Sequence, residues 1–385
     1  MVPPSQSEFP AVWAEVRVGE NLVKLLKDGD QAYPAMLAAI AAATETICLE
    51  TYILRDDATG NRFLDALCSR ARAGVVVLLM FDAWGSDVSG AALNSLREAG
   101  VHVSAFRPWR LSGSIARVLA RHRRRNHRKS LVVDGSVGFT GGMNVSDDYA
   151  SVADGGAGWR DTHLGIVGPG ARALETLFLE TWRRNRGPAF DRSRFRRPAV
   201  VESSSLRIVG NGLVRGRKLV RRAYEEAFSL AKDRIFVTNA YFLPPPQLVR
   251  TLIGAASRGV RVAVVLAGTT DVKLVLYAAR GLYPALLGAG IELYEWSGEH
   301  VLHAKTAVVD GRWTTVGSTN LDPLSLTMNL EVNAIVVDRE FGAAAERLFI
   351  ADLVHCRRIS FDSLERYGLF ERVLSWLAWR VRLWL

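Results

Sequence analysis

Histidine and lysine recur at the same spacing in two distant stretches of the 385-residue chain. The first stretch reads HRKSLVVDGSVGFTGGMN over residues 127–144, and the second reads HAKTAVVDGRWTTVGSTN over residues 303–320. An imidazole and an ammonium two residues apart in an extended segment project from the same face, an arrangement that suits a bound phosphate. The matched pairs, each separated by 176 residues, are His127 and His303, Lys129 and Lys305, Asp134 and Asp310, Gly141 and Gly317, and Asn144 and Asn320.

Small residues and an asparagine complete each copy of the pattern. Each segment turns at a glycine and returns to a pair of small residues, at 141–142 in the first copy and at 317–318 in the second. Such residues let the backbone come close to a ligand, and Asn144 and Asn320 add amide donors. If the two copies pack about a pseudo-twofold axis, two imidazoles, two ammonium groups and two amides converge on one cleft that would bind a phosphodiester.

The signature H-x-K-x4-D, followed by a Gly-Gly or Gly-Ser pair and an asparagine, resembles that of the phospholipase D superfamily. The resemblance implies a mechanism without metal or other cofactor, in which a neutral histidine attacks phosphorus and a protonated histidine serves the leaving alcohol. By the family's usual assignment His127 is the nucleophile and His303 is the acid. Histidine suits both roles because its unperturbed pKa is about 6.5.

The resemblance also assigns roles to the remaining polar residues of the signature. The catalytic set that it defines is His127, Lys129, Asp134, His303, Lys305 and Asp310. The two aspartates of that set are held to be structural in the family. The residues expected to bind the substrate phosphate beside the two lysines are Asn144, Asn320 and Ser318.

A carboxylate is expected beside each catalytic histidine, because an acceptor on the second ring nitrogen fixes the tautomer. Family members supply such a carboxylate downstream of each histidine. Asp161, in WRDTH, and Glu331, in MNLEVN, occupy those places in this chain. We expect Asp161 to orient His127 and Glu331 to orient His303; the alternative for both is a surface carboxylate on a strand.

Helical and strand-like segments alternate in both halves of the chain, which predicts an α/β fold. An Ala-rich helix over residues 31–44 leads into a β-branched strand over residues 46–54, and this order is repeated after residue 237. The strands read as continuous apolar runs, which are typical of sheets covered by helices. We therefore expect two pseudo-twofold-related half-domains, each a mixed sheet flanked by helices, with the active site at their interface.

The predicted organisation has five parts. They are an irregular N-terminus (1–19), a first domain (20–182), a basic linker (183–200), a second domain (201–357) and a C-terminal amphipathic helix (358–385). In the first half Gly100 lies 27 residues before His127. Its counterpart Gly290 lies only 13 residues before His303, which predicts a basic insertion over residues 107–126 of the first domain.

The charge balance favours an anionic partner. The chain has 49 basic and 39 acidic side chains, a net charge of +10 and a pI near 9.8, which suits nucleic acid, phospholipid or a phosphorylated substrate. Three widely spaced cysteines form no C-x-x-C pair, so neither a disulfide framework nor a zinc site is predicted. The N-terminus does not read as a signal peptide and no run reaches about 18 apolar residues. We expect the protein to be made and kept in the cytosol, where it can sit on a membrane surface.

Two basic segments favour a lipid surface as the partner. In the insertion, Ile115, Val118 and Leu119 could form an apolar stripe beside several arginines. Residues 358–385 place tryptophan and arginine around an apolar helical face. Both segments are predicted to contact an anionic membrane. For each of them, a helix packed on its own domain is the alternative.

Three segments narrow the resemblance to bacterial cardiolipin synthases of the phospholipase D type. They read LLKDGDQAYPAMLAAIAAATETICLETYIL, NAYFLPP and TVGSTNLDPLSLTMNLEVN. The chain is similar to the short peripheral kind, which has no N-terminal transmembrane helices. The resemblance implies that the phosphatidyl group of one phosphatidylglycerol is transferred to the hydroxyl of another, giving cardiolipin and glycerol. Phosphatidylethanolamine as the second lipid, and water as the acceptor, stay open.

Two other classes of function compete with this interpretation. A nuclease of the same superfamily would use the same clamp on a nucleic-acid phosphodiester. The basic run has no obvious interleaved aromatic platform, which disfavours nucleic acid as the partner. A non-catalytic membrane adaptor is disfavoured because both motifs are complete. No obligate protein partner is inferred.

Overall fold

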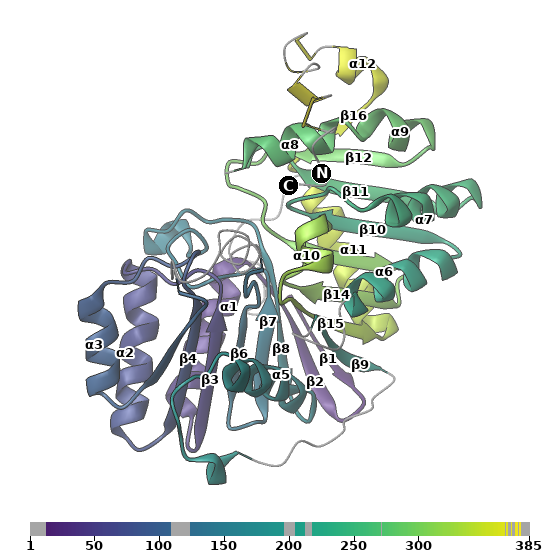
Figure 1. Ribbon diagram of the computed structural model, residues 1–385. Coiled ribbons are helices and arrows are strands. Elements are labelled where there is room, and N and C mark those ends of the chain that lie inside the picture. Colours follow the sequence, from purple (N-terminus) through teal and green to yellow (C-terminus); the bar gives the residue numbers. More distant parts are fainter. Residues whose placement is uncertain are drawn as a thin grey trace.

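The computed structural model describes residues 13–108, 124–195, 205–211, 218–270 and 272–365, together with seven of the residues between 367 and 378. Within these ranges the chain forms two eight-stranded sheets. The first half of the chain, purple to blue in Figure 1, lies beside the second half, green to yellow. Each half therefore has a sheet of its own, as the alternating helices and strands predict.

The first sheet has the strand order β1-β2-β8-β7-β6-β3-β4-β5. Its strands are β1 (Ala14–Val18), β2 (Asn21–Lys27), β3 (Thr46–Thr51), β4 (Val76–Asp82), β5 (His102–Phe106), β6 (Ser130–Val133), β7 (Val137–Gly141) and β8 (Thr162–Val167). Its described helices are α1 (Asp28–Ala42), α2 (Ala58–Arg72), α3 (Gly90–Glu98) and α5 (Gly170–Arg184). Every residue of β3 is buried, including the charged Glu50, in agreement with a strand covered on both faces.

The second sheet has the strand order β16-β12-β11-β10-β13-β14-β15-β9. Its strands are β9 (Leu206–Gly210), β10 (Arg234–Asn239), β11 (Arg261–Ala267), β12 (Glu292–Trp296), β13 (Lys305–Val309), β14 (Trp313–Gly317), β15 (Val332–Val337) and β16 (Cys356–Ile359). The described helices are α6 (Leu219–Leu230), α7 (Pro246–Ser257), α8 (Lys273–Arg280), α9 (Tyr283–Gly288), α10 (Pro323–Thr327), α11 (Arg339–Leu353) and α12 (Phe361–Glu365).

The two sheets share one topology. The order β8-β7-β6-β3-β4-β5 corresponds strand for strand to β15-β14-β13-β10-β11-β12. In both, the three strands before the motif are parallel to one another, and the motif itself forms an antiparallel hairpin, β6–β7 or β13–β14. The predicted α/β class with two related half-domains and mixed sheets is confirmed.

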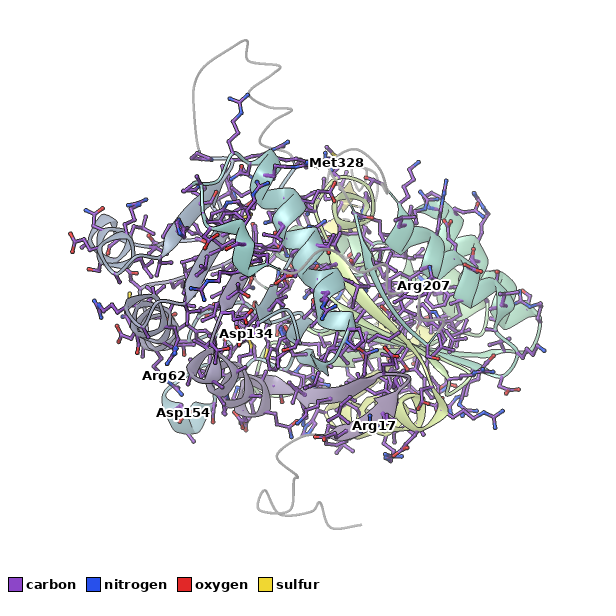
Figure 2. All side chains as sticks on the ribbon, turned by 90° about the horizontal axis from the view of Figure 1, so that it is seen from below. Arg17, Arg62, Asp134, Asp154, Arg207 and Met328 are labelled. Carbon is purple, nitrogen blue, oxygen red and sulfur yellow. The ribbon has the colours of Figure 1, made fainter. Side chains whose placement is uncertain are left out.

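The two halves share a hydrophobic core. One cluster of buried side chains draws on β8, α5, β14, β15 and α11, with Ile166, Phe178, Val316, Val332 and Leu348 among its members. Strands β7 and β8 contact β14 and β15 directly, so the two motif hairpins meet at the centre of the molecule. Charged side chains such as those of Arg17, Arg62 and Asp154 are exposed on the outside (Figure 2).

Three predicted boundaries are wrong. Residues 14–18 form β1, which pairs antiparallel with β2, where an irregular N-terminus was expected. Its alternation of buried and exposed residues is too short to stand out in the sequence. Residues 358 and 359 belong to β16, which pairs with β12 and extends the sheet. Because two of its four residues are exposed arginines, β16 has no apolar pattern that predicts a strand. Helix α5 continues to Arg184, inside the predicted linker.

Of the two predicted membrane segments, the insertion falls largely outside the described residues and the C-terminal segment falls outside them in part. Residues 109–123 of the insertion, including the stripe of Ile115, Val118 and Leu119, lie there, as do residues 379–385. In the described part of the C-terminal segment, Ala378 is buried against Leu243 and Ala278. No described helix is long and apolar enough to cross a bilayer. Membrane contact through either segment stays a prediction.

Candidate active site

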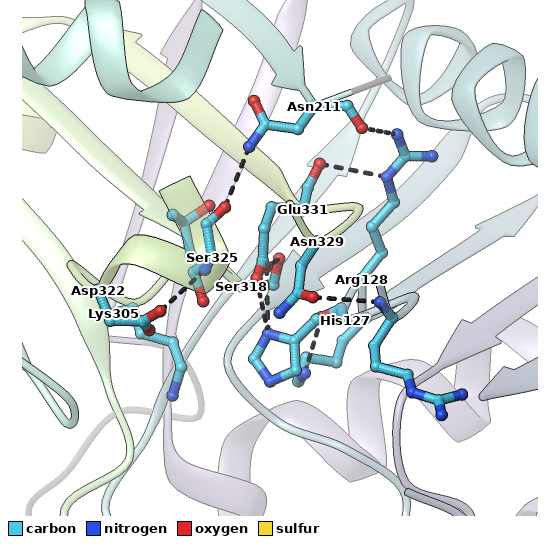
Figure 3. Close-up of polar contacts among 12 residues, drawn as sticks. His127, Arg128, Asn211, Lys305, Ser318, Asp322, Ser325, Asn329 and Glu331 are labelled. Atoms are coloured by element: carbon cyan, nitrogen blue, oxygen red, sulfur yellow. Dashed lines mark hydrogen bonds and ion pairs between the residues drawn. The ribbon is translucent and has the colours of Figure 1, made fainter. Parts of the chain in front are cut away.

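Each motif histidine is bound by a carboxylate from the opposite half. Nδ1 of His127 lies 3.0 and 3.1 Å from the two carboxylate oxygens of Glu331 (Figure 3). Nδ1 of His303 lies 2.7 Å from Oδ2 of Asp161. The prediction that pairs Asp161 with His127 and Glu331 with His303 is therefore wrong in its assignment, although the same two carboxylates contact the histidines.

Short extended segments that cross between the halves cause this exchange. The amide of His127 donates to the carbonyl of Leu330 at 2.9 Å, and the amide of His303 donates to the carbonyl of Arg160 at 2.8 Å. Glu331 directly follows Leu330, and Asp161 directly follows Arg160. Each crossing therefore places a carboxylate beside the histidine of the other half.

Both histidines line one cleft of about 640 Å³. This volume lies within the range of about 300–1,000 Å³ that is typical of small-molecule sites. Since Nδ1 of each ring faces a carboxylate, Nε2 is the nitrogen that can act on a substrate. The predicted convergence of the two copies on a common opening is present in the structure.

The surroundings of the two histidines are not equivalent. Burial lowers the pKa of His127, although the charge of Glu331 opposes the shift, and the ring is therefore neutral at neutral pH. Burial raises the pKa of Asp161 to about 6, with Lys305 opposing it. Asp161 is therefore ionised above about pH 6 and then stabilises a positive charge on the ring of His303.

The two motif lysines lie next to the histidines. Nζ of Lys129 donates to the backbone carbonyl of His127 at 2.8 Å, and Nζ of Lys305 donates to the carbonyl of His303. Burial lowers the pKa of Lys129 to about 7, while the charge of Glu331 opposes this shift. A phosphate that binds beside Lys129 would favour the ammonium form, because it adds a negative charge at close range.

Both motif asparagines line the cleft. Asn144 is held by two contacts, since its Oδ1 accepts from the amide of Ile53 at 3.0 Å and its Nδ2 donates to the hydroxyl of Tyr149 at 2.7 Å. Asn320 is buried, and its Oδ1 has no hydrogen-bond partner among the described residues. The amide of Asn320 is therefore the better placed of the two to turn toward a ligand.

Ser318 contacts a carboxylate instead of the cleft. Its hydroxyl donates to Oε2 of Glu331 (Figure 3), and Ser318 is fully buried. The prediction that Ser318 binds the substrate phosphate is corrected accordingly: it holds the carboxylate that faces His127. At the corresponding position Gly142 packs against Asp161, where an added Cβ would lie 2.1 Å from Oδ1. The carboxylate of Asp161 therefore leaves no room for a side chain at position 142.

Asp134 and Asp310 bind backbone amides at the far end of the motif strands. The carboxylate of Asp134 accepts from the amides of Thr44, Glu45 and Thr46 at 2.8–2.9 Å, and Asp310 accepts from the amides of residues 232–234 in the same way. Neither aspartate lines the cleft. Their inclusion in the catalytic set is corrected: each fixes the chain that enters β3 or β10.

We expect Asp134→Ala to reduce stability without changing the chemistry. The substitution leaves three backbone amides without their charged acceptor, which should lower the free energy of unfolding by about 2–4 kcal/mol. Urea unfolding of the variant measures this loss. Turnover per folded molecule should stay near the wild-type value, and a large fall in that quantity would contradict the structural role.

Aromatic residues around the histidines were missed by the sequence analysis. The ring of Tyr52 lies 4.9 Å from that of His127, and the rings of Tyr149 and Trp159 lie 5.3 and 5.7 Å from that of His303. A signal was available for one of them, because ETYIL in the first half has its counterpart NAYFL, with Tyr241, in the second. Tyr149 and Trp159 have no such matched partner.

Asp322 should make the stability depend on pH. Burial raises the pKa of Asp322 to about 7, and the charge of Glu331 adds to the shift, whereas an unfolded chain has about 3.9. The folded state therefore holds the proton between these values, and stability falls as pH rises from about 4 to 7. Asp322→Asn can keep the bond to the Ser325 amide and should raise the free energy of unfolding by about 1–2 kcal/mol at pH 8. Urea unfolding should show a smaller difference at pH 4; equal differences would contradict the shift.

Comparison with known proteins identifies the family. A family model described as "Cardiolipin synthase, PLD-like domain" matches residues 36–153 and 224–353. The chain is 31% identical to the cardiolipin synthase of Halalkalibacterium halodurans over 356 residues, which are 91% of this chain and 70% of that protein. The chain belongs to the cardiolipin synthase family of phospholipase D-type phosphatidyltransferases. This cardiolipin synthase family member is also 32% identical to the cardiolipin synthase of Geobacillus kaustophilus, over 97% of this chain and 75% of that protein.

Solved structures share the fold of this cardiolipin synthase family member. The phosphatidylserine synthase of Haemophilus influenzae superimposes with a TM-score of 0.74 and 13% identity, over 96% of both chains. The polyphosphate kinase of Porphyromonas gingivalis gives a TM-score of 0.60 over 89% of this chain and 49% of that one. At these identities the likeness concerns the arrangement of the two halves.

Proposed function

We propose that this protein synthesises cardiolipin by moving a phosphatidyl group from one phosphatidylglycerol to the hydroxyl of another, with release of glycerol. The observation that carries the proposal is the pair of histidines, each with a carboxylate on Nδ1, that open on one cleft. In a double displacement at phosphorus, one such imidazole can act as the nucleophile and the other as the general acid and base. The family membership supplies the phosphatidyl group as the group transferred.

In the first step, Nε2 of His127 attacks the phosphorus of the donor lipid. An N–P bond forms and the P–O bond to glycerol breaks, while Nε2 of His303 gives its proton to the departing glycerol oxygen. The lowered pKa of His127 favours the neutral ring that this attack requires. Asp161 stabilises the imidazolium of His303 before the proton leaves.

In the second step, His303 accepts the proton of the hydroxyl of the second phosphatidylglycerol. The oxygen of that hydroxyl attacks phosphorus, the N–P bond to His127 breaks, and cardiolipin forms. Lys129, Lys305 and Asn320 would stabilise the charge on the non-bridging oxygens in both steps. Proton and leaving group balance, because His303 ends protonated and His127 ends neutral.

We also propose that the protein works as a peripheral protein at the cytoplasmic face of the bacterial inner membrane. Its cleft is bordered by Trp84 and Val272, whose exposed fractions are 62% and 43%. Leu274, 44% exposed, follows Val272 on α8. Apolar side chains that stay exposed beside a lipid-binding cleft favour contact with a bilayer. The basic insertion and the C-terminal segment would add to it.

Product analysis tests the proposed function. The full chain is incubated with phosphatidylglycerol vesicles, with and without phosphatidylethanolamine, and the lipids are analysed by mass spectrometry beside a single-stranded DNA digest. A four-chain product from phosphatidylglycerol alone is expected. Phosphatidic acid as the sole product would contradict the synthase assignment, and DNA cleavage without lipid turnover would contradict a lipid function altogether.

A further inference from the structure

The two walls of the cleft differ in charge, although the motifs are related by pseudo-twofold symmetry. The first half contributes two guanidinium groups to the lining, those of Arg55 and Arg125. The described lining residues of the second half include no lysine or arginine, and the apolar side chains of Leu243, Val272 and Leu324 take their place. Among the described lining residues, guanidinium groups therefore lie on the first-half side of the catalytic pair only.

Of the two arginines, Arg55 has its charge compensated at short range. Its Nη1 lies 2.7 Å from Oδ2 of Asp148, which also lines the cleft. Arg125 has a looser ion pair, since its Nη1 lies 3.6 Å from Oδ1 of Asp82. Burial raises the pKa of Asp82, which weakens the charge opposite Arg125. Of these two ion pairs, the one that Arg125 forms is therefore the longer.

Arg125 is also fixed in position close to the nucleophile. Arg125 precedes His127 by two residues. Its backbone amide donates to Oδ1 of Asn329 at 3.1 Å, and its carbonyl accepts from the amide of Leu330 at 2.8 Å. The guanidinium carbon lies 5.0 Å from the centre of the Trp84 ring. A planar guanidinium that lies against an aromatic ring at the wall of the cleft has the geometry to bind the paired oxygens of a phosphate.

The second half lacks this cation at the equivalent position. The carbonyl of Arg125 accepts from Leu330 across the halves, and the carbonyl of Val301 accepts from Arg160 in the same way. Val301 therefore occupies the backbone position that corresponds to Arg125. Because position 301 carries no cation, Arg125 does not act symmetrically on a phosphate that lies between the two histidines. The cation therefore distinguishes one side of the site from the other.

We propose that Arg125, held beside Trp84, binds the phosphodiester of the acceptor lipid. This inference rests on the proposed function. The acceptor phosphatidylglycerol carries its own phosphate, one glycerol unit away from the hydroxyl that attacks, so the product has two phosphates in the cleft at once. The histidines and lysines hold the first, and Arg125 supplies a cation for the second. An acceptor without a phosphate, such as water or ethanol, gains nothing from Arg125.

The partition of the phosphatidyl group between acceptors tests this subsite. Wild type and Arg125→Gln, as full chains, receive phosphatidylglycerol vesicles with added ethanol, and cardiolipin, phosphatidylethanol and phosphatidic acid are quantified together. The ratio of cardiolipin to phosphatidylethanol should fall about ten- to a hundredfold in Arg125→Gln, the effect of losing a charge-assisted hydrogen bond. Arg125→Lys, which keeps the charge, should recover part of the ratio.

Arg261→Gln is the matched control. Arg261 also faces an aromatic ring, at 5.4 Å from that of Phe236, and is paired with Glu292 at 2.7 Å, but it does not line the cleft. Its variant should keep the wild-type ratio. An unchanged ratio in Arg125→Gln, or equal loss of all three products, would overturn the subsite. A wild type that forms none of these products would instead overturn the proposed function.

Discussion

His127→Ala should abolish phosphatidyl transfer, with a loss of about 10⁴-fold or more, because no other group in the cleft can form the covalent intermediate. His303→Ala should be as inactive toward phosphatidylglycerol, because glycerol is a poor leaving group without a proton. A phosphatidyl ester of p-nitrophenol separates the two roles, since p-nitrophenolate leaves without general-acid help. With this substrate His303→Ala should release one equivalent of nitrophenol, and His127→Ala should release none.

Intact-protein mass spectrometry supplies the second readout for that comparison. After reaction with the nitrophenyl ester, His303→Ala should carry the mass of one phosphatidyl group, which acid removes from a phosphohistidine. An adduct on His127→Ala and none on His303→Ala would reverse the two assignments. The Arg261→Gln variant, outside the cleft, should behave as wild type and controls for handling of the lipid.

Asp161→Asn and Glu331→Gln should each lower the rate of transfer about 10³- to 10⁴-fold, since an amide beside Nδ1 can hold the wrong tautomer of its histidine. The exchanged pairing makes a further prediction. Asp161→Asn should cost little more once His303 has been replaced, because the carboxylate of Asp161 contacts His303.

A double-mutant cycle with the nitrophenyl ester measures this coupling. Asp161→Asn alone should leave the nitrophenol burst largely in place, because His127 and Glu331 are intact, whereas Glu331→Gln should slow the burst itself. With this ester, Asp161→Asn should change the burst of the His303→Ala variant no further, so the two substitutions should be strongly non-additive in the turnover that follows the burst. Slowing of the burst by Asp161→Asn, with no effect of Glu331→Gln, would indicate pairing within each half.

The sequence predicts which residues form the site better than it predicts which of them contact one another. The matched spacing of the two motifs predicts the shared cleft, because a repeated strand pattern folds into repeated sheets. The carboxylates could be named but not assigned, since the choice between His127 and His303 depends on contacts to Leu330 and Arg160 across the halves. No local pattern encodes such a crossing. Ser318 was misplaced for a different reason, because its partner Glu331 comes from the neighbouring strand of the same sheet.

Elements at the edges of the sheets were the least predictable. β1 and β16 are short and carry exposed charged residues, so their apolar periodicity is weak and pairing with a neighbouring strand decides their conformation. The central strands were predictable because both of their faces are buried, which makes them rich in apolar and β-branched residues. Arg125 stood out in the sequence only as one of several arginines; its place beside Trp84 depends on the fold.

Because each half supplies the carboxylate that contacts the histidine of the other half, catalysis requires both halves. A first half alone would present His127 without Glu331, and a second half alone would present His303 without Asp161. Substitutions within its own motif could not restore the missing carboxylate to either half. Two separately produced halves should therefore regain turnover only when they are mixed, and a mixture in which either half lacks its histidine should stay inactive.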